Sequence, residues 1–393
     1  MRSNRGVLVA LGALVALGPL ATDAYVPALP ELAAALQSDV GVAQLTVTAT
    51  LLGLGIGQLV AGPWSDRVGR RLPILVGVGS YAFSAAVGAL APTMAVFIAS
   101  RFLQGLGGAF ALVVAYAYVR DRFTGEASVR AFAALLLVAG AGPVIAPLVG
   151  GYVAVLAGWR SVFVVLGLVS VAAGIGAAFG LPETRSRTAP EQRERVWATY
   201  SLLARDKTFM RIALVNATVF GAMFVYIAAS PFVLQQGLGL SVGAYSVVFA
   251  VNAFGLVTMA QVSGRLAGRV GAPRLLRFGV AALVVGAVLT AVAATLTAGQ
   301  LWMMLAGLFI LVSSVGMVLP NAATLALEAH AAHSGAASAI LGFGQYVLGA
   351  VAASLVGVAV IGVPPAAAMS AVIAVLAMTA AALAAGRRRY AAA

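Results

Sequence analysis

The sequence predicts an all-α polytopic membrane protein whose twelve transmembrane helices form two six-helix bundles related by pseudo-twofold symmetry. Of its 393 residues, 62% are hydrophobic and only 9% are charged, whereas a soluble domain carries roughly 25% charged residues. Apolar segments of about 20 residues are long enough to span a bilayer. Twelve such segments follow one another along the chain, at 6–29, 42–62, 73–91, 94–119, 131–156, 161–181, 210–234, 243–263, 275–296, 301–323, 335–359 and 366–386.

The first segment follows Arg2 and Arg5 and could be taken for a secretory signal peptide. However, it contains Asp23, and no polar mature region follows a possible cleavage site. We therefore expect it to be the first membrane helix, ending near Pro30 and broken at Gly18-Pro19.

A polar stretch divides the twelve segments into two blocks of six. Residues 182–209 are rich in charged side chains, whereas the other joins are short and rich in Gly, Pro and Arg. This pattern predicts an N-terminal six-helix bundle at 1–182, a cytoplasmic linker at 183–209, and a C-terminal six-helix bundle with a short basic tail at 210–393.

The basic residues predict the orientation. All but two of the 24 Lys and Arg residues, Arg101 and Arg160, fall in alternate loops or at the termini, and the positive-inside rule places these loops and both termini in the cytoplasm. The net charge of +13 does not indicate nucleic-acid binding, because no basic patch is interleaved with aromatic residues. The chain has no cysteine, which excludes disulfides and thiolate metal sites.

Residues 57–73 form a short charged turn between the second and third segments. Gly57 and Gly62 are expected to let neighbouring backbones approach, and Gly69 to adopt a positive φ. Asp66 is a lone carboxylate among arginines, which predicts an electrostatic latch, although the arginines could merely hold the turn in the cytoplasm. The residues expected to control gating in this turn are Gly62, Asp66, Arg67, Gly69 and Arg70.

The turn is echoed in the second block, which supports the division into two bundles. Residues 62–69 have a counterpart at 264–271, an offset of 202 positions, as expected of parallel halves related by an axis along the membrane normal. Gly268 stands where the first copy has Asp66. We therefore expect the latch to be stronger in the first half.

Two charged residues fall well inside predicted spans, Asp23 in the first and Arg101 in the fourth. A charge at membrane depth costs roughly 2.5–3.5 kcal/mol on insertion scales, so each needs a partner or a water-filled cavity. At 1.5 Å per residue, both lie roughly 10–12 Å below the outer surface. Asp23 is interpreted as a proton-exchanging carboxyl, or as a hydrogen-bonded residue beside the helix break. Arg101 would offset the charge of Asp23 if close, or it snorkels to the surface or pairs with a carbonyl.

The fifth segment combines glycines and prolines. Gly142, Pro143 and Pro147 occur within one and a half turns; the prolines remove backbone donors and bend a helix, while glycines allow tight packing. We expect a bent, tightly packed helix with a part in gating.

These motifs resemble a known family. Residues 57–73 closely resemble the signature loop between helices 2 and 3 of the major facilitator superfamily. The stretch 101–108 resembles the helix 4 motif of that superfamily, and 140–151 resembles the glycine-proline signature in helix 5 of its antiporters. Three further stretches, 18–30, 181–185 and 230–234, look like the bicyclomycin and chloramphenicol/florfenicol resistance branch of drug:proton antiporters.

The resemblance implies a monomeric inner-membrane exporter of small amphipathic drugs that works by rocker-switch alternating access. It implies that Asp23 is both proton and substrate site and that Arg101 takes part in proton coupling. The proton gradient would then supply the energy without a cofactor. The sequence contains no Walker loop, so ATP is not expected to be the energy source. Neutral drugs of the chloramphenicol type are expected to fit better than strongly cationic dyes.

Other residues of the predicted spans are candidates for drug contact, with packing or helix–helix bonding as the alternative for each: Tyr25, Tyr116, Tyr226, Phe232, Asn252, Asn321, Gln345 and Tyr346. Glu328, His330 and His333 could suggest a metal site, but they lie at a predicted cytoplasmic helix end without cysteine, and no metal is expected.

One alternative for the whole chain is a proton-coupled symporter or an exporter of a sugar or other small metabolite. Another is a membrane-embedded enzyme or receptor, but an enzyme needs a convergent catalytic set, which the sequence does not supply.

Overall fold

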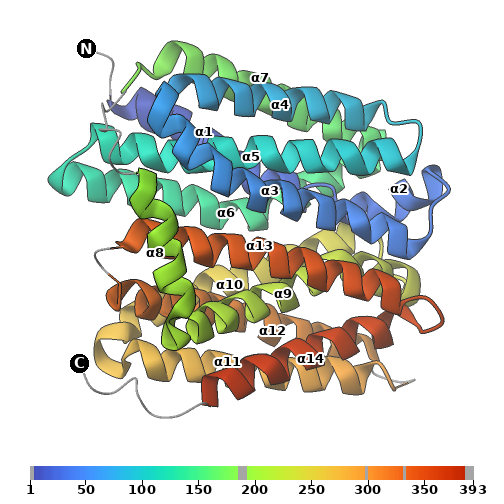
Figure 1. Ribbon diagram of the computed structural model, residues 1–393. Coiled ribbons are helices and arrows are strands. Elements are labelled where there is room, and N and C mark those ends of the chain that lie inside the picture. The colour runs from blue at the N-terminus through green and yellow to red at the C-terminus, as the bar shows by residue number, and fades with distance from the viewer. Residues whose placement is uncertain (1–3, 185–192, 297–299, 331–332, 386–393) are drawn as a thin grey trace. The chain divides into compact units, whose positions relative to one another are not determined.

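The computed structural model describes residues 4–184, 193–296, 300–330 and 333–385. Within these ranges every regular element is a helix, and twelve helices are long and apolar enough to cross a membrane (Figure 1). The predicted fold class is therefore confirmed. The chain folds as two compact units: unit 1 comprises Met1–Ala189 and Val242–Ser246, and unit 2 comprises Pro190–Ser241 and Val247–Ala393.

Unit 1 contains the first six spans. Its helices are α1 (Asn4–Asp23), the short 3₁₀ helix η1 (Val26–Ala28), α2 (Leu29–Ala35), α3 (Val40–Val68), α4 (Arg71–Ala89), α5 (Met94–Arg122), α6 (Gly125–Ala157) and α7 (Trp159–Gly180). Helix α5 packs against α3 and α4, α7 packs against α4, and α1 packs against α5 and α6. Helices α1 and α5, which carry the two charges predicted at membrane depth, are therefore direct neighbours.

The first span breaks at a different place from the one predicted. The α-helix continues through Pro19 and ends at Asp23, and η1 and α2 follow within the same candidate span. The prediction of a break at Gly18-Pro19 and a helix end near Pro30 was wrong. Pro27 and Pro30 lack a backbone N–H, so a regular α-helix cannot be hydrogen-bonded through this stretch. As a result, Asp23 lies at the break itself.

Small residues set the spacing of α3 and α5. A Cβ added at Gly57 would lie 2.5 Å from the Cβ of Ala109, so the predicted close approach at Gly57 is confirmed. At Gly62, by contrast, nothing lies within 4 Å of an added Cβ, and the predicted close approach there was wrong because no neighbouring helix reaches that position. Gly69 has φ +97°, as predicted.

Helix α6 packs tightly against α1. It runs from Gly125 to Ala157 with Pro143 and Pro147 inside it. A Cβ at Gly142 would lie 2.6 Å from the Cβ of Pro19, and one at Gly150 would collide with the carbonyl group of Ala24. The expected tight packing of this helix is confirmed. Helix α6 packs against the segment of α1 that ends at Asp23.

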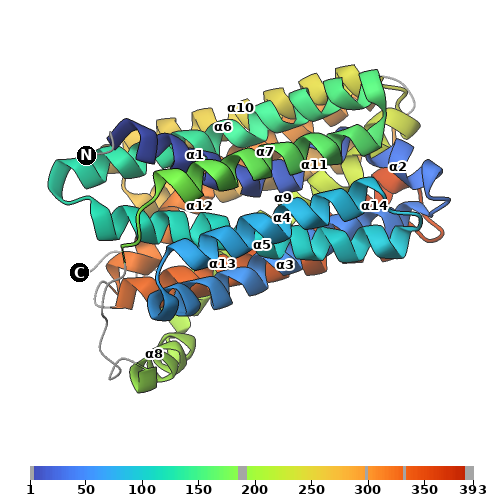
Figure 2. The ribbon, with the colours of Figure 1, turned by 90° about the horizontal axis from the view of Figure 1, so that it is seen from above.

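Unit 2 contains the last six spans, apart from the first five residues of α10, Val242–Ser246, and one additional helix. Its elements are α8 (Arg193–Arg205), α9 (Lys207–Pro231), the π-helix η3 (Phe232–Gly237), α10 (Val242–Val270), α11 (Ala272–Ala293), α12 (Gln300–Glu328), α13 (Ser334–Ala359) and α14 (Pro365–Ala385). Helix α9 is enclosed by α12, α13 and α14. Helix α8 lies within the segment predicted as the linker and runs across the direction of the long helices of its unit (Figure 1, Figure 2).

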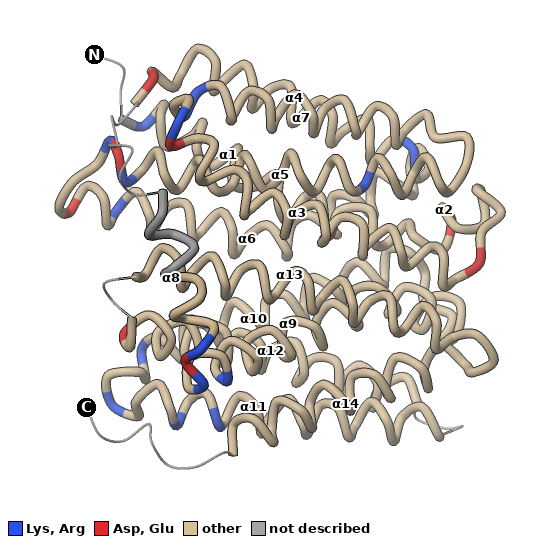
Figure 3. The backbone as a smooth tube through the Cα atoms, in the orientation of Figure 1, with Lys and Arg blue, Asp and Glu red and all other residues tan. Residues whose placement is uncertain are grey.

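Charged side chains gather at the ends of the long helices. Figure 3 shows that, within each unit, most of the described Lys and Arg residues lie at one end of the helices. This distribution is the structural counterpart of the alternation of basic loops in the sequence.

Candidate functional site

The carboxyl group of Asp23 is the buried acidic group of unit 1. Asp23 is the last residue of α1, and its exposed fraction is 4%. Its Oδ1 atom is buried and has no hydrogen-bond partner among the described residues. Because an unpaired charge in an apolar interior is costly and binding a proton removes it, this oxygen is suited to hold a proton or to accept a hydrogen bond from a ligand.

Arg101 on α5 is fully buried and binds the chain on both sides of Asp23. Its guanidinium donates hydrogen bonds to the backbone carbonyl of Ala21 and to Oε1 of Gln104. Its Cζ atom lies 4.3 Å from the ring centroid of Tyr25, a cation–π contact. Ala21 and Tyr25 are two residues before and two residues after Asp23, so Arg101 fixes the backbone around the helix break.

The two buried charges do not form an ion pair. The ion pairs formed by the described residues join other side chains. Arg101 instead pairs with a carbonyl, which was the structural alternative for this residue. No described side chain therefore forms an ion pair with Asp23, and Arg101 contacts the backbone and the ring on either side of it.

The hydroxyl of Tyr25, one of the predicted contact residues, lies 3.0 Å from Oγ1 of Thr46 on α3. Thr46 and several other uncharged polar groups near these helices were missed by sequence reasoning. The side-chain amide of Gln44, the Tyr81 hydroxyl and Nε2 of Gln104 are buried without a hydrogen-bond partner among the described residues. Their only sequence signal is a polar residue inside an apolar span, which does not separate a buried group from one that faces a neighbouring helix.

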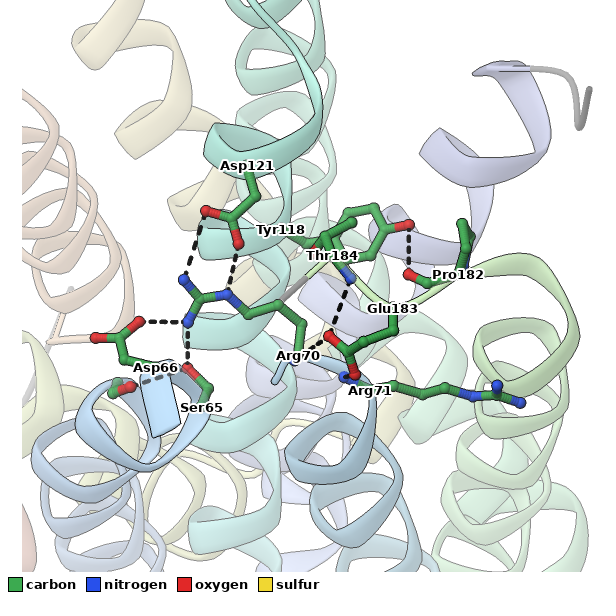
Figure 4. A network of polar contacts seen from close by, with 10 residues as sticks. Ser65, Asp66, Arg70, Arg71, Tyr118, Asp121, Pro182, Glu183 and Thr184 are labelled. Atoms are coloured by element: carbon green, nitrogen blue, oxygen red, sulfur yellow. Dashed lines mark hydrogen bonds and ion pairs between the residues drawn. The ribbon is translucent and has the colours of Figure 1, made fainter. Parts of the chain in front are cut away.

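The charged turn between α3 and α4 is a network centred on Arg70, whose side chain is 8% exposed (Figure 4). Its Nε donates to Oδ2 of Asp121 at 2.7 Å, and one terminal nitrogen donates to Asp66 at 2.5 Å and to Ser65 at 2.7 Å. Burial disfavours the charged guanidinium, but the hydrogen bonds and charges of Asp121 and Asp66 outweigh burial and raise the pKa of Arg70.

A third carboxylate completes this network. Glu183, which follows α7, accepts hydrogen bonds from the backbone N–H groups of Arg70 and Arg71 at 2.8 and 3.2 Å. It thereby binds the exposed N–H groups at the start of α4. The description of Asp66 as a lone carboxylate was wrong, because Asp121 at the end of α5 and Glu183 after α7, both distant in sequence, also bind this turn. Arg67, in contrast, is exposed, and no described side chain pairs with it.

The predicted contact residues of unit 2 lie on several of its helices. Asn252 on α10 donates to the Tyr226 hydroxyl on α9 at 3.0 Å, and both side chains are buried. The ring of Phe249 stacks on Tyr226 with centroids 5.6 Å apart. Asn321 on α12 donates to Oγ of Ser263 on α10 at 2.6 Å. These neutral hydrogen bonds join helices, which was the structural alternative for each of these residues.

The remaining candidates for drug contact are buried, pack against aromatic rings or are half-buried. Phe232 is buried at the start of η3. Tyr346 meets Phe220 edge-on with centroids 5.4 Å apart, and Gln345 is half-buried. In unit 1, half-buried Tyr116 stacks on Phe132 of α6 at 6.1 Å. The structure thus distributes the predicted contact residues over both units.

The residues considered for a metal site do not form one. No group of three or more possible His, Cys, Asp or Glu ligands occurs among the described residues. His330 instead lies with its Nε2 atom 2.9 Å from Oδ2 of Asp206, the residue whose carboxylate caps the start of α9.

Comparison with known proteins identifies the family. The model for the Major Facilitator Superfamily matches residues 11–354. The chain belongs to this superfamily. A solved structure of a member, a D-xylose-proton symporter, is 15% identical to this chain, covers 96% of both chains and has a TM-score of 0.77. At that identity the likeness shows the fold.

Several superfamily relatives are considerably more similar in sequence. An uncharacterized transporter of the superfamily from Bacillus subtilis, YdgK, is 36% identical over 88% of this chain and 87% of its own. A chloramphenicol resistance protein from Pseudomonas aeruginosa is 37% identical over 70% of this chain and 65% of its own. A bicyclomycin resistance protein homolog from Haemophilus influenzae is 29% identical over 89% and 88%. These relatives support the drug-efflux branch of the superfamily, which the sequence motifs resemble. Membership and the twelve apolar helices make the chain a multi-pass membrane protein of a transporter family.

Proposed function

We propose that this superfamily member is a proton-coupled antiporter that exports small amphipathic drugs of the chloramphenicol, florfenicol or bicyclomycin type by alternating access. It works as a monomer in the bacterial inner membrane, with both termini in the cytoplasm and the proton gradient as its energy source. The observation that carries the proposal is the buried carboxyl group of Asp23, whose Oδ1 atom has no hydrogen-bond partner among the described residues.

Exchange follows from competition for this one group. A drug that hydrogen-bonds to Asp23 from the cytoplasmic side favours release of its proton, and a proton that binds from the outside favours release of the drug. A ligand shifts a conformational equilibrium only by its different affinity for the two states. Competition at Asp23 supplies that difference without a second acid.

The other residues have supporting roles. Arg101 keeps the helix break in place through the Ala21 carbonyl and the Tyr25 ring, so that Asp23 has one defined position. The neutral polar and aromatic side chains named above, such as Asn252 and Tyr226, supply hydrogen bonds and apolar surface to an uncharged drug. Such lining is typical of small-molecule sites.

The charged turn and α6 control the conformational change. Asp66 and Arg70 stabilise one position of the α3–α4 turn, and the glycine and prolines of α6, Gly142, Pro143 and Pro147, give the helix next to Asp23 its close packing. Asp66→Asn is therefore expected to slow export and to change affinity within the binding-competent state little.

The first test measures proton release on drug binding. Chloramphenicol is added to the purified protein in weakly buffered detergent, and proton release is recorded with a pH indicator. The parent is expected to release protons, and Asp23→Asn to release none while it remains folded. Asp39→Asn removes an exposed carboxylate at the start of α3 and should behave like the parent. Proton release by Asp23→Asn would show that the coupling site lies elsewhere.

The second test separates export from symport. Proteoliposomes loaded with chloramphenicol are given a pH gradient of either sign, and drug efflux and uptake are followed. An antiporter moves drug against the proton flow, whereas a symporter moves it with that flow. Counterflow of a sugar but not of chloramphenicol would favour a metabolite transporter instead. A susceptibility panel in an efflux-deficient host, with and without an uncoupler, then defines the drug range.

A further inference from the structure

The turn between α10 and α11 repeats the charged turn between α3 and α4. Residues 264–271 correspond to 62–69 with an offset of 202 positions. Both turns pass through a glycine with positive φ, +97° at Gly69 and +84° at Gly271, and each is followed directly by a long helix. The two turns therefore share a backbone design, and their side chains can be compared position by position.

The first turn satisfies its central arginine, Arg70, within unit 1. Arg70 is held by Asp66 and Asp121, and the carboxylate of Glu183 accepts from the first backbone N–H groups of the turn. This copy contains the anions that Arg70 and the start of α4 require, whereas Arg67 is exposed and has no ion-pair partner among the described residues.

The second turn has four arginines and no carboxylate, although only Arg269 matches an arginine of the first turn, Arg67, and Ala272 stands where the first copy has Arg70. Its basic residues are Arg265, Arg269, Arg274 and Arg277, all exposed, and none forms an ion pair with a described residue. Gly268 replaces the acid of the first copy. Arg265 and Arg269 are four residues apart on one helix face, where like charges are destabilising. Four neighbouring exposed cations without an ion-pair partner among the described residues form a basic surface that attracts an external anion.

Exposed apolar side chains lie beside these arginines. Phe278 is 61% exposed and lies four residues after Arg274, on the same face of α11. Leu266 is 36% exposed and lies three residues before Arg269 on α10. Both helices are candidate membrane spans, and Figure 3 shows basic residues at the ends of α10 and α11. An exposed aromatic ring one turn inside a basic helix end fits the boundary between headgroups and acyl chains.

We propose that Arg269 and Arg274 bind the phosphate of an anionic phospholipid headgroup at the α10–α11 turn, with an acyl chain along Phe278. The guanidinium fork matches phosphate geometry and donates two parallel hydrogen bonds to it. Basic groups at helix ends attract anionic lipids. The lipid phosphate supplies the negative charge that residues 264–277 themselves lack. This site is independent of the drug and proton site.

The test measures lipid binding directly. Purified protein in detergent is titrated with phosphatidylglycerol or with zwitterionic phosphatidylcholine, and bound lipid is counted by native mass spectrometry. At about 1 kcal/mol for each arginine near the surface and tenfold for each 1.4 kcal/mol, the double variant Arg269→Gln, Arg274→Gln should bind phosphatidylglycerol roughly thirtyfold more weakly. Its binding of phosphatidylcholine should not change.

Matched variants distinguish a site from general surface charge. Arg122→Gln with Arg130→Gln removes the same charge from exposed positions of unit 1 and should leave phosphatidylglycerol binding unchanged. The Arg269→Lys, Arg274→Lys variant keeps the charge and should recover most of the binding. Equal loss in the two glutamine double variants would overturn the proposal. So would displacement of the lipid by equimolar inorganic phosphate, because the site would then take free phosphate.

Discussion

The network around Arg70 leads to a prediction about the relative weight of its two carboxylates. The side chain of Asp121 is 16% exposed and that of Asp66 is 55% exposed, and both pair with a guanidinium that is 8% exposed. An exposed ion pair contributes about 0.2–1 kcal/mol, whereas a hydrogen bond to a charged group contributes about 1.5–3 kcal/mol. The α5 residue Asp121 should therefore hold the turn more strongly than the signature residue Asp66.

These values convert into a measurable change in how often the turn opens. At 1.4 kcal/mol for each factor of ten, Asp121→Asn should increase the opening equilibrium constant roughly tenfold to hundredfold. Asp66→Asn should increase it at most about fivefold. Hydrogen exchange of a peptide that covers the turn reports this constant through the amides of Gly69 and Ile74, which are bonded to Ser65 and Arg70.

The control removes a carboxylate that does not contact Arg70. Glu126→Gln changes an exposed acid in the first turn of α6 and should leave exchange of the α3–α4 turn unchanged. Faster exchange in Asp66→Asn than in Asp121→Asn would refute the reasoning, because it would mean that exposure does not determine the strength of these pairs.

Three other predictions follow from single sites. Arg101→Lys keeps a charge but lacks the fork, so transport should fall at least about tenfold, as expected when one charge-assisted hydrogen bond is lost, while folding by size-exclusion chromatography is kept. In this cysteine-free chain, a cysteine at Ser38 should react with an impermeant maleimide from outside the cell, and one at Arg122 should not; the reverse pattern would invert the topology. Burial would raise the pKa of Asp206, but hydrogen bonds from the start of α9 and from His330 outweigh it and lower the pKa below its usual 3.8. The stabilisation is therefore present at neutral pH and lost as pH falls through the lowered pKa, so Asp206→Asn should reduce Tm at neutral pH, with a difference from the parent that shrinks in acid.

The sequence was sufficient to predict the helices but not which residues of different helices contact one another. Twelve apolar segments predicted twelve spans because only helices of that length satisfy their backbone groups in lipid. The alternation of charge and the Gly69 turn are likewise local features. Asp121 and Glu183 could not be assigned to the latch, because their contacts with the α3–α4 turn depend on how α5 and the end of α7 pack.

Contacts between helices also could not be predicted at the candidate transport site. Equal depth suggested that Asp23 and Arg101 could meet, but depth does not determine the direction in which a side chain points. The helix break at Asp23 exposes the carbonyl group of Ala21, and Arg101 binds this group instead of the carboxylate. A break can be expected from Pro27 and Pro30, but its position depends on packing against α6.

The two units differ in the charge of the side chains that they bury. Among the described residues, the buried charged side chains, Asp23, Arg70 and Arg101, all belong to unit 1, and the buried polar side chains of unit 2 are neutral. We infer that changes in unit 2 alter drug preference without changing proton release per drug bound. Asn252→Ala removes an amide that the proposed function assigns to drug contact, together with its bond to the Tyr226 hydroxyl. Because one hydrogen bond contributes about 0.5–1.5 kcal/mol, loss of one bond to the drug should change drug affinity roughly twofold to tenfold. The proton released per bound chloramphenicol, measured at saturation, should stay at the parent value. A variant that binds the drug normally but releases no proton would show that coupling also depends on unit 2.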